Sequence, residues 1–213
     1  MARPRQPLIS RDTAVAAAIQ IIDEEGLEAF SLPRLARRLN VRAPSLYHHF
    51  TDKSEILSAV ARTIVAETVV PRKPDPSEWP EWFVQLGLNF RQAVLRHRNA
   101  APVLLQFLPR EVLTQLYDNA AVFLEQSGVP AHLHVQILDG METLALGASI
   151  TEAMRPATRK AIFPNVDPER QPALARALAA NELTAKKLFE ETIRSFLHGV
   201  MHFADQRAAD THG

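Results

Sequence analysis

The sequence predicts an all-α fold, in which a small N-terminal group of helices precedes a larger helical domain. Apolar residues recur at spacings of three and four along most of the 213 residues, which is the period of a helix. No segment alternates apolar and polar residues as a strand would, and there is no internal repeat. Serine or aspartate precedes several apolar stretches and glycine or proline follows them, as at the two ends of helices.

The first 70 residues are expected to form four helices. Ser10 can cap a first helix that runs to about Glu25. Ser31 can cap a short second helix with Pro33 in its first turn, where a missing N–H costs little. A turn then leads to a short third helix, and Asp52 can cap a long fourth one. The expected spans are 11–25, 32–39, 43–49 and 53–70.

Longer helices follow a proline-rich linker, PRKPDP, over residues 71–76. Their apolar stripes lie at about 83–97, 104–108, 113–128, 130–154 and 181–206, and a loop with Pro156, Pro164, Pro168 and Pro172 is expected before the last one. The last two long helices are apolar on wide faces, so they need a surface beyond one neighbour to bury against. A copy of the chain across a two-fold axis would supply it. The alternative is that both helices lie deep in a single core.

Charge and composition narrow the class of protein. Lys and Arg together number 24, as do Asp and Glu, and a net charge of zero counts mildly against nucleic-acid binding. The positive charge is concentrated, however, with five basic residues and one acidic residue between Ser31 and Lys53, and with Arg3, Arg5 and Arg11 upstream. Cysteine is absent, and no apolar run reaches the roughly 20 residues that cross a membrane. We expect a cytoplasmic protein without disulfides or membrane contact.

Residues 31–53, SLPRLARRLNVRAPSLYHHFTDK, have the plan of a helix-turn-helix: two short helices joined by a tight turn. In this plan the second helix enters the major groove of DNA, with its first residues at the base edges. Arg37 and Arg38 fit a solvated helix face better than a base-reading role. The residues expected to face DNA are Arg42, Ala43, Pro44, Ser45, Tyr47 and His48.

The pattern of this segment resembles the DNA-binding motif of the TetR family of bacterial repressors. The matching residues are Ser31, Leu35, Ala36, Leu39, Val41, Pro44 through Phe50, and Lys53. The stretches 90–98 and 189–199 are similar to the tetracycline-repressor-like branch of that family. The resemblance implies a three-helix helix-turn-helix DNA-binding domain over residues 1–54. It implies a larger helical domain for effector binding and dimerisation over residues 55–213.

The resemblance also implies roles for single residues. Ser31, Tyr47 and Lys53 are expected to contact backbone phosphates. Arginine can bind guanine through two hydrogen bonds, and small apolar residues suit the methyl group of thymine. The base-contacting positions hold Arg42, Ala43, Pro44, Ser45 and His48. Pro33 stands where relatives often carry a base-reading arginine, so at least one base pair is expected to be read differently.

In this family the larger domain binds a small molecule and dimerises through its last two helices. The tetracycline branch holds a magnesium–drug complex, but the aligned positions here are Val69, Leu86, Leu104 and Ala120. An apolar or aromatic effector bound without metal is therefore expected. The expected pocket residues are Leu86, Phe90, Leu104, Ala120 and Leu144. The expected dimer interface includes Ile193, Phe196, Leu197 and Val200.

Two functions of different classes remain open. The first is a homodimeric repressor that leaves a palindromic double-stranded DNA operator when a small molecule binds. The second is an all-α enzyme or carrier with an incidental basic segment, although an enzyme has no reason to carry the 31–53 motif. His198 and His202 have the spacing of metal ligands but lack the glutamate of a zinc-protease helix. No catalytic residue, cofactor or metal site is expected, and Glu142 could serve as a pocket acceptor or as the partner of an arginine.

Overall fold

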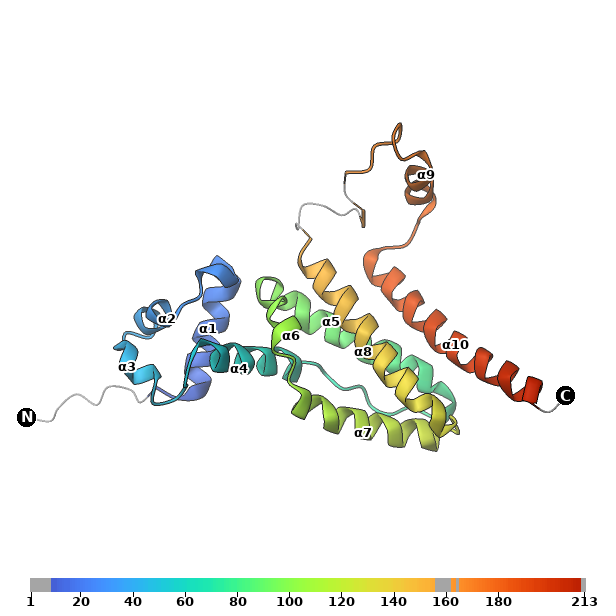
Figure 1. The fold of residues 1–213 in the computed structure, drawn as a ribbon, viewed down its shortest axis with the longest axis horizontal. Helices are drawn as coiled ribbons and strands as arrows, with labels where there is room; N and C mark the ends of the chain where they lie inside the picture. The colour runs from blue at the N-terminus through green and yellow to red at the C-terminus, as the bar shows by residue number, and fades with distance from the viewer. Residues whose placement is uncertain (1–8, 156–161, 164, 212–213) are drawn as a thin grey trace, which may run out of the picture.

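The computed structural model describes residues 9–155, 162–163 and 165–211, and this part of the chain contains helices and connecting segments but no strand. The expectation of an all-α fold is confirmed. A small N-terminal group of helices is joined by one helix to a larger group, and the last helix runs toward the opposite end of the molecule (Figure 1). Arg3, Arg5, Pro156 and Pro164 lie outside the described residues.

The N-terminal group consists of α1 (Arg11–Glu25), the short 3-10 helix η1 (Leu27–Ala29), α2 (Leu32–Arg38) and α3 (Ala43–Leu46). Ser10 caps α1 as expected. Its hydroxyl accepts a hydrogen bond from the Thr13 amide at 3.1 Å, and the Thr13 hydroxyl accepts one from the Ser10 amide at 3.0 Å. Ser31 caps α2, because its hydroxyl accepts a hydrogen bond from the Arg34 amide at 3.3 Å.

The turn between α2 and α3 depends on Asn40, whose φ of 54° lies in the left-handed region. Asparagine tolerates this region better than most residues. The Asn40 amide donates to the Arg37 carbonyl and the Val41 amide donates to the Ala36 carbonyl, a pattern that closes a helix at its C-terminus. The third helix is shorter than expected, because the chain turns after Leu46 and brings Phe50 into the core.

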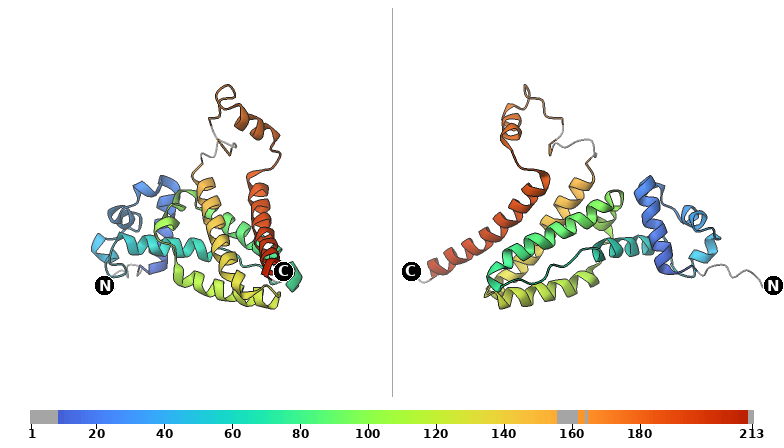
Figure 2. Two further views of the ribbon diagram at one scale, coloured as in Figure 1. Left: turned by 45° about the vertical axis from the view of Figure 1, so that its right-hand side comes forward. Right: turned by 180° about the vertical axis from the view of Figure 1, so that it is seen from behind.

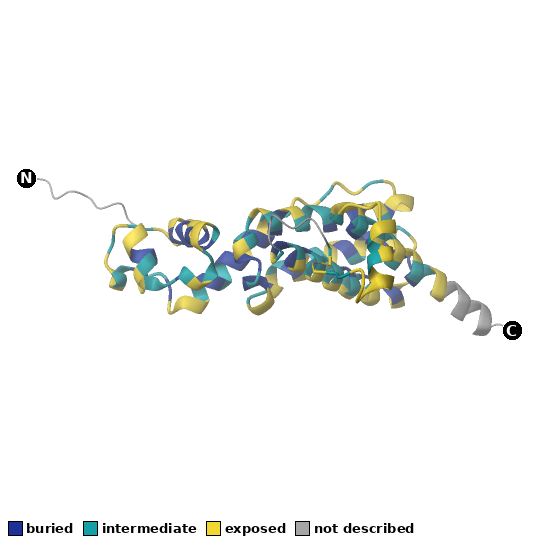
Figure 3. Cartoon of the chain, turned by 90° about the horizontal axis from the view of Figure 1, so that it is seen from above, coloured by how far each residue is buried: buried dark blue, intermediate teal, exposed yellow. Residues whose placement is uncertain are grey.

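The fourth helix, α4 (Lys53–Ala66), connects the two parts of the molecule. Asp52 caps it by accepting from the Glu55 amide at 2.9 Å. Ile56, Val60 and Ile64 on one face of α4 are fully buried. They belong to a first core that also includes buried residues of α1, α2 and α3 and of the larger helices. Buried residues therefore run without a break from the N-terminal group into the larger domain (Figure 3).

The larger domain is a bundle of long helices. These are α5 (Trp79–Arg96), α7 (Arg110–Gln126), α8 (Ala131–Ala153) and α10 (Ala185–Thr211). The short helix η2 (Pro76–Glu78) precedes α5, and η3 (Arg98–Ala100) and α6 (Val103–Gln106) lie between α5 and α7. A second core fills the middle of this bundle with Trp82, Phe83, Phe123 and Ile137. The linker before α5 is held against the bundle, since the Trp82 indole N–H donates to the Pro71 carbonyl at 3.0 Å.

One helix lies where a loop was expected. The segment α9 (Pro172–Ala180) follows α8 and precedes α10, and it projects from the bundle on long connections (Figure 2). None of its residues is buried. Pro172 stands at the start of this helix, where proline is favoured, and the sequence PALARALAA that it opens is rich in alanine. The last helix begins four residues later than expected, at Ala185.

The placement of three expected interface residues on α10 requires a correction. Ile193, Leu197 and Val200 are buried inside the single chain, in the second core between α5, α8 and α10. The apolar stripe of α10 therefore packs within the monomer, as the single-core alternative had it. Phe196 is half-buried, with its ring against Gly140 of α8.

Candidate DNA-binding surface and effector cavity

The helix-turn-helix presents an exposed polar surface around α3. Arg42, Pro44, Tyr47, His48 and Lys53 are exposed, and the Tyr47 side chain is among the most exposed large apolar groups of the described chain, at 57%. Ala43 and Ser45 are half-buried, whereas Leu46 and Phe50 are buried against α1, α2 and α4. The side chains expected to meet DNA therefore share one accessible region, and the apolar ones fix its shape.

Arg11 of α1 holds the end of this region in place. Its guanidinium donates to the His49 carbonyl, lies 2.7 Å from the Glu55 carboxylate and stacks 4.5 Å above the Phe50 ring. The Glu55 carboxylate also accepts from the Thr51 amide at 2.6 Å. The hydrogen bond from this amide, followed by the one from Arg11, holds the pKa of Glu55 below its ordinary value. The start of α4 is thus set by the packing of α1.

Some of the basic residues in and around the helix-turn-helix are held in ion pairs within the chain, and others are not. Arg34 pairs with Glu25 at 2.5 Å, and Arg38 pairs with Glu24, both across the α1–α2 contact. These pairs support the interpretation of Arg38 as part of the helix surface. In the described part of the chain, by contrast, no ion pair involves Arg37, Arg42 or Lys53. The Lys53 ammonium lies 5.6 Å from the centre of the Phe30 ring.

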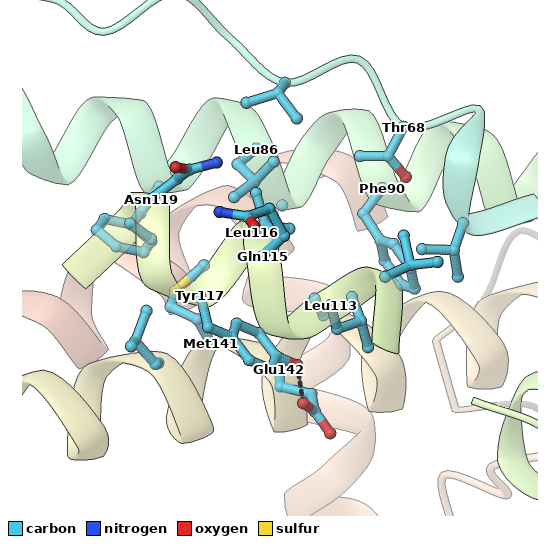
Figure 4. Close-up of a pocket in the computed structure, with 18 of the residues that line it drawn as sticks. Thr68, Leu86, Phe90, Leu113, Gln115, Leu116, Tyr117, Asn119, Met141 and Glu142 are labelled. Atoms are coloured by element: carbon cyan, nitrogen blue, oxygen red, sulfur yellow. Dashed lines mark hydrogen bonds between the residues drawn. The ribbon is translucent and has the colours of Figure 1, made fainter. Parts of the chain in front are cut away.

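A cavity of about 710 Å³ lies in the larger domain between α4, α5, α7 and α8 (Figure 4). Its size falls within the range that holds small molecules. Leu86, Phe90 and Ala120 line it, as expected. Val65 and Ala66, at the end of α4, line it too, so one helix runs from the DNA-facing surface to the cavity wall.

Two other expected pocket residues lie elsewhere. Leu104 is buried in the first core, on the short helix α6. Leu144 is half-buried on the side of α8 that faces away from the cavity, while its neighbours Met141, Ala145 and Leu146 line the wall.

Glu142 closes one side of the cavity together with Tyr117 and Arg110. The Tyr117 hydroxyl donates to the Glu142 carboxylate (Figure 4), and Arg110 donates to both carboxylate oxygens at 2.7 and 2.9 Å. Burial, and then the neighbouring carboxylate, raise the pKa of Tyr117 well above its ordinary value. Glu142 therefore pairs with an arginine, which is one of the two roles left open by the sequence, and it does so at the wall of the cavity.

The sequence did not indicate that Lys73, Gln115 and Asn119 are among the polar residues that line the cavity. Lys73, from the linker before α5, donates to the backbone carbonyl of Asn119 at 3.1 Å, and its ammonium lies 5.5 Å from the centre of the Phe123 ring. Gln115 and Asn119, one turn apart on α7, also line the cavity. Nothing in the sequence distinguishes these residues from an ordinary solvated helix face and linker.

A histidine joins the N-terminal group to the larger domain. His97, at the end of α5, lies with Nδ1 2.7 Å from the Asp23 carboxylate of α1 and Nε2 3.1 Å from the Glu67 carboxylate that follows α4. Asn99 donates to the Asp23 carbonyl at 2.8 Å. Burial lowers the pKa of His97, but the hydrogen bonds and charges of the two carboxylates outweigh it, and the pKa lies above its ordinary value.

The described residues hold no group of three or more side chains suited to a metal ion. His198 and His202 stack with ring centres 6.2 Å apart on α10. Among the described helices, none combines the length and the apolar character needed to cross a membrane.

Comparisons with known proteins match this arrangement. The sequence pattern described as "Bacterial regulatory proteins, tetR family" matches residues 14–60. The class A tetracycline repressor of Escherichia coli is 31% identical over 144 residues, which are 66% of each chain, and the class E repressor of the same species is 25% identical over 93% of this chain and 94% of its own. The crystal structure of apo ActR from Streptomyces coelicolor superimposes with a TM-score of 0.74 at 23% identity, over 97% of this chain and 99% of that one. The chain therefore belongs to the TetR family of bacterial regulatory proteins, and it is a DNA-binding transcriptional regulator rather than an enzyme.

Proposed function

We propose that the protein is a repressor that binds a palindromic DNA operator as a homodimer and leaves it when a small apolar or aromatic molecule enters the cavity of the larger domain. The observation that carries this proposal is the course of α4 (Lys53–Ala66). The helix begins beside the exposed surface of α3 and ends in the wall of the cavity. A change at the cavity can therefore move the DNA-facing surface through one rigid element.

On the DNA side, the proposal assigns phosphate contacts to Ser31, Tyr47 and Lys53 and base contacts to Arg42, Ala43, Pro44, Ser45 and His48. The support is their exposure or partial exposure around α3 and the absence of ion pairs of Arg42 and Lys53 among the described residues. Such cations can exchange water and salt ions for phosphate without breaking an internal pair. BioQ, a structure 25% identical with a TM-score of 0.61 over 81% of this chain, has been solved with its double-stranded DNA operator.

The homodimer would form through the exposed outer faces of α8 and α10, because the apolar stripe of α10 is already buried within the chain. Val135 on α8 is 76% exposed and Phe203 on α10 is 62% exposed. Gly147 and Gly199, on the same two helices, have open space where a side chain would be. Glycine destabilises a helix, and its presence on these helices suits close approach of another backbone. We further propose that residues 1–54 act as the DNA-binding domain and residues 55–213 as the effector and dimerisation domain.

The effector side of the proposal depends on the lining of the cavity, which is mostly Leu, Val, Phe, Ala and Met. An apolar ligand gains affinity there from burial of its surface. ActR of Streptomyces coelicolor, a similar fold, has been solved in complex with actinorhodin. The effector must bind the DNA-free conformation more tightly than the DNA-bound one, because equal affinity for both would shift nothing.

The test is selection of bound sequences from a random pool of double-stranded DNA. The expected product is an inverted repeat, with half-site centres about one helical turn or a multiple of it apart. The affinity for the selected site should fall steeply with salt. Enrichment of no sequence, or of a single half-site without a repeat, would contradict the proposal.

A further inference from the structure

We propose that the effector is an acid: a molecule with an apolar or aromatic body whose anionic group lies at the mouth of the cavity, against Lys73, Gln115 and Asn119. The inference depends on the proposed function, since it names the chemical class of the ligand of the same cavity. It follows from three features of the lining: an uncompensated positive charge, two unused amides beside it, and an apolar interior.

The two charged side chains that line the cavity differ in whether an oppositely charged partner neutralises them. Its lining includes one carboxylate, Glu142, and one ammonium group, Lys73. Arg110 meets the charge of Glu142 at 2.7 and 2.9 Å, and the Tyr117 hydroxyl donates to the same carboxylate. Glu142 therefore has little capacity left for a cationic ligand. Lys73 has a carbonyl and an aromatic face as neighbours, and no carboxylate among the described residues lies within ion-pair distance of it.

Hydrogen-bond donors gather on the same side of the cavity as Lys73. The Lys73 ammonium is bonded to the backbone carbonyl of Asn119, so it lies beside that residue on α7. The amide groups of Gln115 and Asn119 lie between α7 and α5 (Figure 4). Neither amide side chain has a hydrogen-bond partner within the described part of the chain. A carboxylate, sulfonate or phenolate accepts several hydrogen bonds at once, and bonds to a charged acceptor are stronger than those between neutral groups.

The rest of the cavity fixes the orientation of such a ligand. Phe90, Leu113 and Leu86 line the interior, and a charge placed among them would lose its hydration without compensation. Lys73, Gln115 and Asn119 are themselves exposed, so an anion beside them stays in contact with water. The apolar body therefore lies inside, and the anionic group lies at the mouth.

The test uses two fluorescent probes of nearly the same shape, anilinonaphthalene sulfonate and the neutral N-phenylnaphthylamine, with the full chain and no DNA. Trp82 lines the cavity and Trp79 lies one turn away on α5, so energy transfer from tryptophan reports a probe bound in this part of the bundle, and competition between the probes then locates it. Lys73→Met is expected to weaken binding of the sulfonate by roughly tenfold or more, as for loss of one charge-assisted hydrogen bond. Binding of the neutral probe should change by less than about twofold, within the scatter for a surface residue.

Two control variants separate charge at the mouth from other effects. Lys73→Arg should retain binding of the sulfonate, because it keeps the positive charge. Arg72→Met removes the same charge from the neighbouring exposed residue, which does not line the cavity, and should leave both probes unaffected. Equal weakening of both probes in Lys73→Met, or no weakening of either, would overturn the inference.

Competition between the probes locates the sulfonate. If the neutral probe displaces it, both occupy the cavity, as the inference requires. If the sulfonate binds without being displaced, its site lies elsewhere and the inference is wrong, although the apolar effector of the proposed function stands. If neither probe transfers energy from Trp82, the effector part of the proposed function fails as well, whatever the outcome of the DNA selection.

Discussion

At the scale of single residues, the structure divides the arginines and lysines of the helix-turn-helix by what they contact. Arg34 and Arg38 are engaged with Glu25 and Glu24, which ties α2 to α1. Arg42 and Lys53 have no such partner in the described chain and lie on the exposed side. Surface pairs of the first kind contribute at most about 1 kcal/mol each to stability, so they are a minor part of what joins α2 to α1.

Arg42 and Lys53 should differ in what their loss does to DNA binding. Lys53→Ala should weaken binding to all sequences to a similar degree and reduce the slope of log affinity against log salt by about one. Arg42→Ala should relax the preference at one base pair, with a loss of roughly 1–3 kcal/mol for the selected site. Fluorescence anisotropy with the selected operator and with single-base variants measures both effects.

Arg62→Ala is the matched control for these variants. It removes a cation from the same helix as Lys53, but from a residue that pairs with Glu111 in the larger domain. Its affinity and salt slope should equal those of the wild type. An Arg42→Ala protein with an unchanged base preference would show that Arg42 is not a base contact.

The helix caps of this chain can be predicted from its sequence, whereas several of its cavity residues cannot. The prediction of Ser10, Ser31 and Asp52 as helix caps is confirmed. A capping side chain accepts from a backbone amide three residues further along, so a short stretch of sequence is enough to predict it. Lys73 and Gln115 were missed as cavity residues, because their position depends on how the linker crosses α7, which no local pattern encodes. The prediction of Leu104 as a pocket residue is wrong because an apolar side chain suits a core and a pocket equally well, and Leu104 lies in the core.

At the scale of elements, the junction between α1 and the end of α5 is built on His97. The imidazole lies between the carboxylates of Asp23 and Glu67, and Arg96 also meets Glu67 at 3.1 Å. One oxygen of Asp23 is buried without a hydrogen-bond partner. The positive charge of a protonated imidazole therefore favours this arrangement, and its loss would leave two carboxylates close together with less compensation.

The stability of the protein should accordingly depend on pH through His97. Its pKa in the folded state lies above the ordinary value of about 6.5. The contribution of the junction is thus fully present below about pH 6.5 and is lost as the pH rises through the folded-state pKa. Each tenfold difference between the folded and unfolded ionisation constants is about 1.4 kcal/mol.

Urea unfolding at several pH values, with wild type and His97→Gln compared, measures this dependence. The difference in free energy of unfolding between the two proteins should shrink as the pH rises above 6.5. His132→Gln, at an exposed residue near the start of α8, should follow the wild type at every pH. A difference that stays constant with pH would mean that the His97 side chain contributes by packing alone.

Among the elements, the sequence predicted the long helices far better than the segment between α8 and α10. Helices α1, α4, α7 and α8 begin or end beside serine, aspartate, glycine or proline within a few residues of the expected positions. The prolines at 156, 164, 168 and 172 favour a loop over the segment that contains α9. None of the residues of α9 is buried, so its short apolar side, with Leu174 and Leu178, belongs to neither core.

At the scale of the whole molecule, α8 and α10 each have two apolar faces, one buried within the chain and one exposed. One face of each helix packs against α5 within the chain, and this face contains Ile137, Ile193 and Leu197. A second face leaves Val135 and Phe203 exposed. The sequence predicted that two burial surfaces were needed, but it could not assign residues to each, because both stripes are apolar at helical spacing.

This division gives a sharp test of the proposed dimer. Val135→Arg changes a side chain that is 76% exposed in the single chain, so the fold should tolerate it. In the dimer, the charge would be buried without a partner, at a cost of several kcal/mol per subunit. The expected product is a folded monomer with unchanged helical circular dichroism, half the mass in light scattering and lost affinity for the palindromic operator.

Val122→Arg, the same change at a 40% exposed residue of α7, should remain dimeric and bind DNA normally. If Val135→Arg instead stays dimeric, the two-fold contact does not include this face of α8, and the copies of the helix-turn-helix must be paired by another surface.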